Sequence, residues 1–303
     1  MGELLAIVSM TLFAAANISI GSKHKGRVSR GGAFLSIVIT FALSFSIWLG
    51  FSLSAGFAAV DGRAIAWFAL AGLLTALVGR IFLYASIRHL GAVRGAAIKR
   101  LNPFFSVLLG VTLLGELVSL PMAIGMALIV ASFAVLIRES LRAETAAQRG
   151  QAGSIYERIA NLGYLQGPVS ALAYASGYVA RKQGLLIVSD PALGTMIGAG
   201  TGILLFLLLA LGIDTLRSDL RATFTELNPW LWLAGLFTSC GQLIYFAALQ
   251  YTTISKIALI TSMEVFVTMF LTRLLLPGER RISRDVWLAA LLGVIGTLLV
   301  IRY

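Results

Sequence analysis

Long apolar segments follow one another along almost the whole chain, separated by short polar connections. A helix that crosses a bilayer needs about 20 apolar residues, and in lipid only its own hydrogen bonds can satisfy its backbone. Only 12% of the 303 residues are charged and 58% are hydrophobic, whereas about 25% are charged in an average soluble domain. We therefore predict an all-α integral membrane protein with ten transmembrane helices, near residues 3–22, 33–58, 64–87, 92–114, 118–137, 162–180, 191–213, 229–250, 254–276 and 286–301.

Several functional classes lack the residues that their chemistry requires. Cys240 is the only cysteine and the two histidines have no ligand spacing, so neither a disulfide nor a metal site is expected. No GxxxxGK(S/T) phosphate loop occurs, so we expect no cofactor and no ATP-driven transport by this chain alone. The net charge of +11 fits basic loops facing anionic lipid. Because no basic segment carries interleaved aromatic residues, we expect no nucleic-acid binding. We also expect no enzyme, because the sequence shows no His/Asp/Ser constellation, no metal-ligand cluster and no acidic pair at helical spacing.

The two halves of the sequence repeat the same polar landmarks. GRIFLYAS around Arg80 matches GQLIYFAA around Gln242, and Glu116 in LLGE matches Glu279 in LPGE at the corresponding distance. Each half contains five spans, an odd number, so the second half must enter the membrane upside down. Inverted repeats are typical of secondary transporters, which bind substrate near the midplane at the repeat interface. We predict a first five-helix repeat at 1–137, a connecting loop or surface helix at 138–161, and a second, inverted repeat at 162–303.

These landmarks resemble the ten-helix, EamA-like branch of the drug/metabolite transporter (DMT) superfamily. The resemblance spans nearly the whole chain and implies export or exchange of small metabolites, amino acids or drugs, with both termini in the cytoplasm. It is carried by Arg80-Ile-Phe-Leu-Tyr84-Ala, by Leu101-Asn-Pro103-Phe-Phe with Leu114-Gly-Glu116, and by their second-half counterparts.

The sequence departs from the family's pattern at three places. Phe13 stands where a tryptophan is common in the first span, and Val265 stands where the ninth span would match the proline of the fourth. Lys99 and Arg100 occupy positions that are more often small or apolar in the family. We interpret these two cations as this chain's own addition to the family frame, and therefore as a first place to look for its substrate.

Basic residues are distributed unequally between the predicted loops. Fifteen lie after spans one, three, five, seven and nine, whereas five lie on the opposite side, Arg181 and Lys182 among them. Basic loops face the cytoplasm, so this distribution predicts that both termini face outward, opposite to what the resemblance implies. We expect a multi-pass protein of the bacterial inner (plasma) membrane. The sequence leaves monomer and homodimer open.

Polar side chains inside the apolar spans mark the predicted substrate site, because a charge at the centre of a bilayer helix costs about 2.5–3.5 kcal/mol. Arg80 and Gln242 are repeat mates, and so are Asn102 and Glu264. We expect such mates to lie at comparable depth and to face one another across a central cavity. Alternatively, Arg80 pairs with Glu264 or with backbone carbonyls and merely holds helices together. Glu264 is the candidate for proton coupling.

The remaining candidates lie in spans three, four, six and eight. One of Lys99 and Arg100 is expected to bind substrate while the other pairs with Glu264 or lipid phosphate, unless both snorkel to the headgroups. Pro103 lacks an N–H and is expected either to break span four beside a cavity or simply to kink it. Tyrosines combine an apolar body with a polar tip and suit a mixed cavity wall, unless they only bond carbonyls. Those inside the spans are Tyr84, Tyr174, Tyr178 and Tyr245.

Two further patterns have structural interpretations. Glu116 and Glu279 each stand just before a span, so we expect each carboxylate to cap the N-terminus of the helix that follows it. Small residues recur every fourth position in spans two and seven, which permits close helix packing either within the chain or in a dimer. These residues are Ser36, Thr40 and Ser44, and Gly194, Gly198 and Gly202.

Together these features predict a secondary active transporter that moves a small metabolite by alternating access, as an exporter or exchanger. Buried cations outnumber buried acids, which favours an anionic or zwitterionic substrate such as an amino acid or an organic or phosphorylated acid. The expected partners are this small molecule, the lipid bilayer and a coupled proton or counter-substrate. The alternatives are a lipid flippase and a membrane-embedded enzyme that acts on a lipid-linked substrate.

Overall fold

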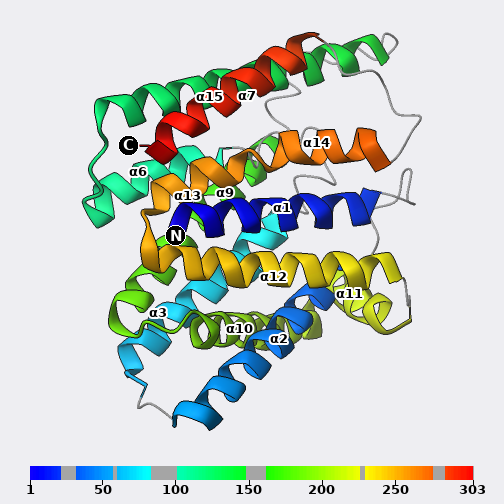
Figure 1. Cartoon of the computed structure of the whole chain (residues 1–303). Coiled ribbons are helices and arrows are strands. Elements are labelled where there is room, and N and C mark those ends of the chain that lie inside the picture. Colours follow the sequence, from blue (N-terminus) through cyan, green and yellow to red (C-terminus); the bar gives the residue numbers. More distant parts are fainter. Residues whose placement is uncertain are drawn as a thin grey trace.

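The computed structural model describes residues 1–21, 32–56, 60–82, 101–147, 162–225, 229–275 and 284–302. Within these ranges every regular element is a helix (Figure 1). The elements in chain order are α1 (Gly2–Gly21), α2 (Gly32–Ala55), α3 (Gly62–Gly72), the π-helical segment η1 (Leu73–Gly79), α6 (Asn102–Leu114), α7 (Leu120–Ala147), α9 (Leu162–Ile187), α10 (Pro191–Gly212), α11 (Asp214–Thr225), α12 (Pro229–Tyr251), α13 (Ile254–Ser262), α14 (Glu264–Leu275) and α15 (Arg284–Arg302).

Five helical segments in the described ranges are long and apolar enough to cross a membrane. Four further apolar helices are shorter, and each of the ten predicted spans overlaps a described helix. The helix α9, which is less hydrophobic, carries the sixth predicted span and is not among these nine apolar segments. The five long segments are Gly32–Ala55, Gly62–Phe82, Pro191–Gly212, Pro229–Tyr251 and Ile254–Leu271.

The helices form a bundle in which both chain ends lie on the same side (Figure 1). At one edge α7 packs along α15, and at the opposite edge α2 packs on α10 and α12. Between these edges α1 lies along α12. The helix α9 contacts α3, η1, α6, α12 and α13, and so touches helices from both halves of the sequence. Side chains on α9 are therefore well placed to contribute to a site shared by the two halves.

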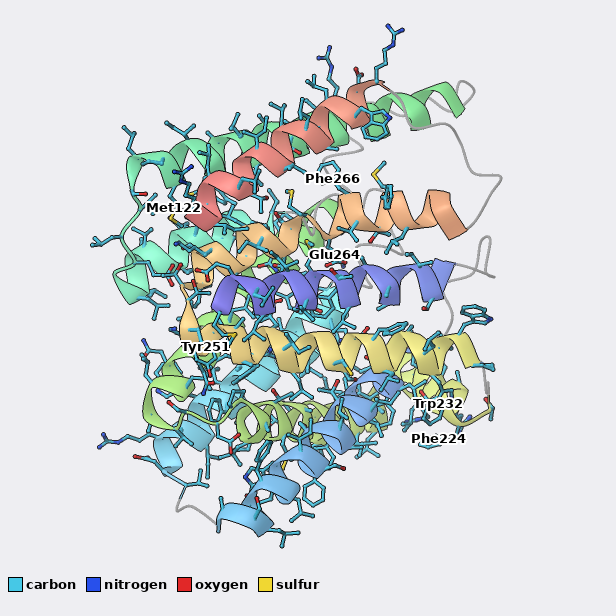
Figure 2. The ribbon with its side chains drawn as sticks, in the orientation of Figure 1. Met122, Phe224, Trp232, Tyr251, Glu264 and Phe266 are labelled. Carbon is cyan, nitrogen blue, oxygen red and sulfur yellow. The ribbon has the colours of Figure 1, made fainter. Side chains whose placement is uncertain are left out.

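Aromatic side chains mark the two ends of α12. Figure 2 shows Trp232 near one end of this helix and Tyr251 at the other, and both side chains are exposed on the bundle surface. At 1.5 Å per residue they are separated by about 30 Å along the axis, the thickness of the hydrocarbon core. Aromatic residues at such a separation are typical of a helix anchored at both membrane interfaces.

The glycine stripe of α10 faces helices of the same chain. Gly198 lies against Gly72 of α3 so closely that a Cβ added to Gly72 would collide with the Gly198 carbonyl. One turn further, a Cβ on Gly202 would lie 2.7 Å from the Cβ of Ala76. Of the two predicted uses of Gly194, Gly198 and Gly202, the structure therefore assigns these contacts to packing within the chain.

The hydroxyl stripe of α2 also packs within the chain. Thr40 Oγ1 and Ser239 Oγ of α12 are hydrogen bonded at 2.9 Å, and Ser239 Oγ donates to the carbonyl of Ser36 at 3.4 Å. Ser44 Oγ donates back to the carbonyl of Thr40 at 2.7 Å, which satisfies this hydroxyl inside its own helix. Small hydroxyl residues thus let α2 approach α12 while every one of these polar groups keeps a partner.

The predicted ninth span is broken into two helices. The turn at Met263 separates α13 from α14, and α14 restarts at Glu264. The helix α6 begins at Asn102, which is the repeat mate of Glu264, and Pro103 occupies its first turn, where a missing N–H has no cost. The break in α13–α14 occurs without a proline. Sequence analysis predicted a break or kink only beside Pro103 in the fourth span, of which residues 92–100 lie outside the described ranges, and missed the break at Met263.

Two other helical parts lie outside the ten predicted spans. The helix α7 continues to Ala147, ten residues into the predicted connection at 138–161, of which residues 148–161 lie outside the described ranges. The amphipathic helix α11 was not predicted, because the sequence between spans seven and eight is short and polar. Its Leu216 is buried against the bundle.

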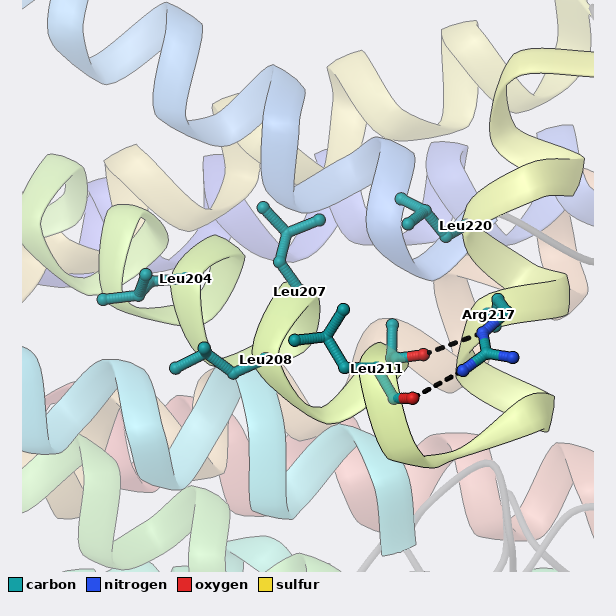
Figure 3. A pocket seen from close by; sticks show the side chains of 7 residues that line it. Leu204, Leu207, Leu208, Leu211, Arg217 and Leu220 are labelled. Atoms are coloured by element: carbon teal, nitrogen blue, oxygen red, sulfur yellow. Dashed lines mark hydrogen bonds between the residues drawn. The ribbon is translucent and has the colours of Figure 1, made fainter.

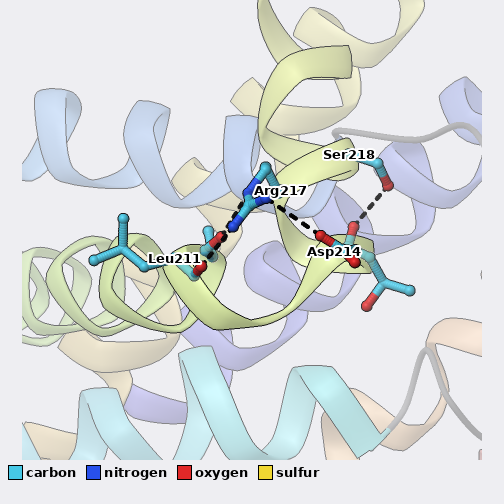
Figure 4. Close-up of polar contacts among 6 residues, drawn as sticks. Leu211, Asp214, Arg217 and Ser218 are labelled. Atoms are coloured by element: carbon cyan, nitrogen blue, oxygen red, sulfur yellow. Dashed lines mark hydrogen bonds and ion pairs between the residues drawn. The ribbon is translucent and has the colours of Figure 1, made fainter.

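Arg217 attaches α11 to the end of α10 (Figure 4). Its Nε donates to the carbonyl of Ala210 at 3.2 Å, its Nη2 to that of Leu211 at 2.5 Å, and its Nη1 to Asp214 Oδ1 at 3.3 Å. The negative end of the α10 dipole also stabilises a cation at these carbonyls. The open pocket beside Arg217 is almost wholly apolar, so it does not suit a polar solute (Figure 3). It is lined by Leu204, Leu207, Leu208, Ala210, Leu211, Arg217 and Leu220.

Candidate functional site

A buried arginine joins three elements at the centre of the bundle. Arg181 of α9 is only 6% exposed, and its Nη2 donates to Thr75 Oγ1 of η1 at 3.2 Å. When the amide of Gln242 is oriented so that its oxygen faces the guanidinium, this oxygen accepts from both Nη1 and Nη2. Arg181 therefore connects the π-helical segment of the first half to α12 of the second half. π-Helical segments are frequent at functional sites.

Aromatic rings surround this guanidinium. It lies 5.0 Å from the ring centroid of Phe246 and 5.8 Å from that of Tyr178, within the range of cation–π attraction. The Tyr178 ring lies 4.7 Å from that of Tyr245 and 6.4 Å from that of Tyr174. The Tyr245 side chain is 3% exposed, and its hydroxyl has no hydrogen-bond partner within the described part of the chain. The structure thus brings three of the four predicted tyrosines together with Gln242.

Arg80 lies at the end of η1 but does not face Gln242. Its Nη1 donates to the carbonyl of Ala33 and to Ser36 Oγ, both at 2.8 Å, and so ties the third span to α2. The expectation that Arg80 and Gln242 would face one another is wrong, because Gln242 binds Arg181 instead. Of the alternatives for Arg80, contact with a backbone carbonyl is the one observed. Its charge still lies within electrostatic range of Arg181.

The second predicted pair lies at the starts of two helices, α14 and α6. Glu264 stands at the first turn of α14 (Figure 2), and Asn102 stands at the first residue of α6. Asn102 Oδ1 accepts from Ser106 Oγ at 3.1 Å, one turn along its own helix. A carboxylate at a helix N-terminus is favoured by the helix dipole. The remaining candidates lie outside the described residues: Tyr84, Lys99, Arg100 and Glu279.

With this geometry in view, comparison with known proteins identifies the family. A model of the EamA-like transporter family matches the chain twice, over residues 1–138 and 161–302. The chain belongs to the EamA-like transporter family. It is accordingly a multi-pass integral membrane protein of the DMT type, and the family indicates a transporter rather than an enzyme. The cluster around Arg181 takes residues from both family matches, with Thr75 in the first and Gln242 in the second.

A solved structure shares the fold of this EamA-like protein. It is described only as "Crystal structure of protein" and covers 99% of this chain and 98% of its own, with a TM-score of 0.69 and 16% sequence identity. At this identity the likeness establishes the architecture alone. No curated protein matches the chain.

The Leu114-Gly115-Glu116 motif has a structural role here, but not the one expected. Glu116 Oε1 accepts from the backbone N–H of Ile254 at 2.7 Å, and Oε2 accepts from the N–H of Ser255 at 3.1 Å and from its Oγ at 2.5 Å. The carboxylate therefore caps α13 in the other half of the molecule, not α7, which follows it. Gly110 makes room for this contact, since a Cβ there would lie 2.5 Å from Glu116 Oε2.

Sequence analysis missed Arg181 because it ended the sixth span at Ala180 and assigned Arg181 and Lys182 to a loop. Both residues lie inside α9, which continues to Ile187. Lys182 Nζ donates to the carbonyls of Leu249 and Thr252 and so holds the end of α12. A signal was present nonetheless: Tyr174, Tyr178 and Arg181 follow one another at intervals of four and three residues, which places them on one helix face.

Proposed function

We propose that this EamA-like protein is a secondary active transporter that moves a small metabolite across the membrane by alternating access, as an exporter or exchanger. The observation that carries this proposal is the buried polar cluster of Arg181, Gln242 and the tyrosines. It lies where helices of the two family-matched segments meet. Polar groups in this position are costly in a membrane protein and are associated with substrate pathways.

Equivalent hydrogen bonds in the two halves support the proposed inverted repeat. Ser9 Oγ of α1 donates to the carbonyl of Gly241 at 2.7 Å, and Ser170 Oγ of α9 donates to the carbonyl of Gly79 at 2.5 Å. Ser9 and Ser170 are related by the sequence repeat, and so are Gly241 and Gly79. Exchanging the two halves therefore converts one contact into the other, as a pseudo-twofold axis requires.

The helix pairs obey the same exchange. The helix α1 packs on α12 and α14, while its counterpart α9 packs on α3, η1 and α6. The pairs α2 with α10 and α7 with α15 join equivalent helices of the two halves. This arrangement supports ten spans in two inverted five-helix repeats. Alternating access then corresponds to movement of one set of helices against its counterpart around the shared site.

The charge of the site favours an anionic or zwitterionic substrate. Arg80 and Arg181 both lie near the repeat interface, and guanidinium groups bind carboxylate or phosphate through paired hydrogen bonds. We retain Glu264 as the candidate for proton coupling, because it stands at the break between α13 and α14. The proposed substrate-binding set comprises Arg80, Tyr84, Lys99, Arg100, Asn102, Tyr174, Tyr178, Gln242, Tyr245 and Glu264, with Arg181 added from the structure.

The placement of Arg181 and Lys182 also strengthens the proposed orientation. Without them, three of the five basic residues counted on the outward side remain, namely Arg63, Lys256 and Arg302, against fifteen in the odd-numbered loops. We therefore propose that these loops face the cytoplasm of a bacterial inner membrane. A reporter that is active only in the cytoplasm, fused after Tyr303, should be silent, and an active fusion would reverse this orientation.

Transport by purified protein in liposomes tests the function directly. Anionic, zwitterionic and cationic small metabolites are supplied as separate pools, and accumulation is compared with that of empty liposomes. We expect uptake from the anionic or zwitterionic pools. Uptake of cations alone would refute the charge argument. If no soluble metabolite moves but labelled phospholipid changes leaflet in a headgroup-dependent way, the flippase alternative replaces the proposal.

A further inference from the structure

We propose that the Arg181 guanidinium is the anion receptor of this transporter, and that an oxyanion of the substrate binds it together with the Tyr245 hydroxyl. The proposed ligand group is a carboxylate or a phosphate. This inference rests on the proposed transport function and assigns to its site a specific pair of side chains. Neither the family match nor the sequence prediction includes Arg181 in a site.

The first argument is the charge balance around Arg181. The described ion pairs are Met1 with Glu3 and Arg217 with Asp214, so no described carboxylate neutralises Arg181. Its described hydrogen-bond partners, Thr75 and Gln242, are both neutral. The charge of Arg80 lies within electrostatic range and has the same sign. A buried charge is normally paired, so the described surroundings of this guanidinium lack the anion that a cation in such a place requires.

The second argument is the Tyr245 hydroxyl. It is buried and unpartnered among the described residues. The Tyr245 ring packs at a tilt against that of Tyr178, which in turn contacts the Arg181 guanidinium. Buried hydroxyl groups nearly always have a hydrogen-bond partner. An oxyanion bound to Arg181 would supply an acceptor for this hydroxyl. The planar guanidinium can bind two oxygens of a carboxylate or phosphate at once. In this structure the Gln242 amide oxygen accepts from both Nη1 and Nη2, the N–H donors that the substrate oxygens would use.

The third argument is the contrast with other basic side chains in the described part of the chain. Arg217 donates to two carbonyls at the end of α10 and to Asp214, and Lys182 donates to two carbonyls at the end of α12. These groups satisfy helix ends, which is a structural task. Arg181 instead binds only side chains in the described structure. Side chains can rotate away when a ligand arrives, whereas backbone carbonyls of a helix end cannot.

Ligand-induced thermal stabilisation of the full-length protein in detergent tests the assignment. Inorganic phosphate and glutarate serve as separate oxyanion probes, and tetraethylammonium at equal ionic strength serves as the cation control. We expect at least one oxyanion, but not the cation, to raise the Tm of the wild-type protein. Arg181→Gln should lower the affinity of the protein for that oxyanion about a hundredfold, and Tyr245→Phe should lower it about tenfold.

Arg217→Gln is the matched control, since it makes the same chemical change at a guanidinium bonded to a helix end, and its response should equal that of the wild type. Arg181→Lys keeps the charge and should retain part of the binding if Arg181→Gln does not fold. An unchanged oxyanion affinity in Arg181→Gln or in Tyr245→Phe overturns the assignment, as does a wild-type protein that responds to neither oxyanion.

If liposomes transport anions and Arg181→Gln does so with the same KM, the inference fails while the transport function stands. If the Arg181-dependent binding is present but nothing is transported, the transport function fails instead.

Discussion

Removal of the Glu116 carboxylate should destabilise the whole bundle, because this group connects the two halves. It accepts three hydrogen bonds at the start of α13, from the N–H groups of Ile254 and Ser255 and from Ser255 Oγ. In Glu116→Ala these N–H groups lose their acceptor at a helix start where both residues are fully buried. The second half of the molecule is therefore expected to loosen although the substitution lies in the first.

The expected cost follows from the number and kind of these bonds. Loss of an ordinary N-terminal cap costs about 1 kcal/mol, and a hydrogen bond to a charged group contributes about 1.5–3 kcal/mol. With three bonds that share one carboxylate, we expect Glu116→Ala to lower stability by about 2–4 kcal/mol. Asp61 is a suitable comparison: it caps α3 through one bond to the N–H of Arg63 at an exposed site. Asp61→Ala should therefore cost about 0.5–1 kcal/mol.

The assay is unfolding of the detergent-solubilised protein, followed by tryptophan fluorescence with increasing temperature and with increasing denaturant. Glu116→Gln provides a sharper comparison than alanine. The glutamine keeps the shape of the side chain but turns an NH₂ group, a donor, towards one of the donors of Ile254 or Ser255. It should therefore recover less than half of the loss. Equal stability of Glu116→Ala and Asp61→Ala would refute the capping argument.

A double-mutant cycle with Gly110 tests the same contact from the other side. A Cβ on Gly110 would lie 2.5 Å from Glu116 Oε2 and 2.8 Å from Ser255 Oγ, so Gly110→Ala must displace the carboxylate. In a Glu116→Ala background that clash with the carboxylate is absent. The two substitutions together should cost about 1–2 kcal/mol less than the sum of the single ones, as expected for residues in contact. Additive costs would show that the carboxylate does not occupy this position.

Three further outcomes are expected. Gly72→Ala should lower the Tm and reduce transport, because its Cβ would collide with the Gly198 carbonyl. Gly198→Ala should be tolerated, because its Cβ would lie 3.4 Å from the Phe68 carbonyl. Equal effects of the two substitutions on thermal unfolding would contradict this packing. An anion on the opposite side of the membrane should accelerate efflux about tenfold in liposomes, because return of the empty transporter leaves the buried Arg181 unneutralised. Net efflux at the same rate without that anion argues against exchange. Glu264→Gln should abolish the stimulation of transport by a proton gradient imposed across the liposome membrane, and an unchanged response to the gradient would exclude Glu264 as the coupling group.

Hydropathy was sufficient to locate the helices, because lipid imposes a length and a composition on every spanning segment. The same criterion failed for α11, whose alternation of polar and apolar residues suits a helix packed against the end of α10 rather than one inside lipid. It also shortened α9 at Ala180, because a charge normally ends a span. Arg181 shows why that rule has exceptions: a cation is tolerated at this depth when rings and side-chain oxygens from other helices surround it.

Contacts between the halves were the part of the site that the sequence could not provide. The repeat predicted that Glu116 would cap a helix, but the nearest helix in sequence was the wrong one, because the capped N-terminus belongs to α13. Similarly, repeat symmetry paired Arg80 with Gln242, whereas each has a different partner in space. Sequence offsets relate equivalent positions. They do not say which positions touch.

The symmetry of the repeat also separates residues that build the frame from residues that set the chemistry. Phe13 packs against Gly241 just as its repeat mate Tyr174 packs against Gly79, so this contact between a ring and a glycine belongs to the frame of both halves. Of this pair only Tyr174, in the second half, carries a hydroxyl. Likewise, the residue of the first half that is equivalent to Arg181 is the apolar Ile20. An exact repeat would place the same groups on both sides of the interface and give a site without direction. Because the polar groups gather on α9 and α12, a bound anion would be held mainly by the second half. We therefore expect movement of α9 relative to α1 and α2, rather than a symmetric opening of both halves, to expose the site to the two sides of the membrane in turn.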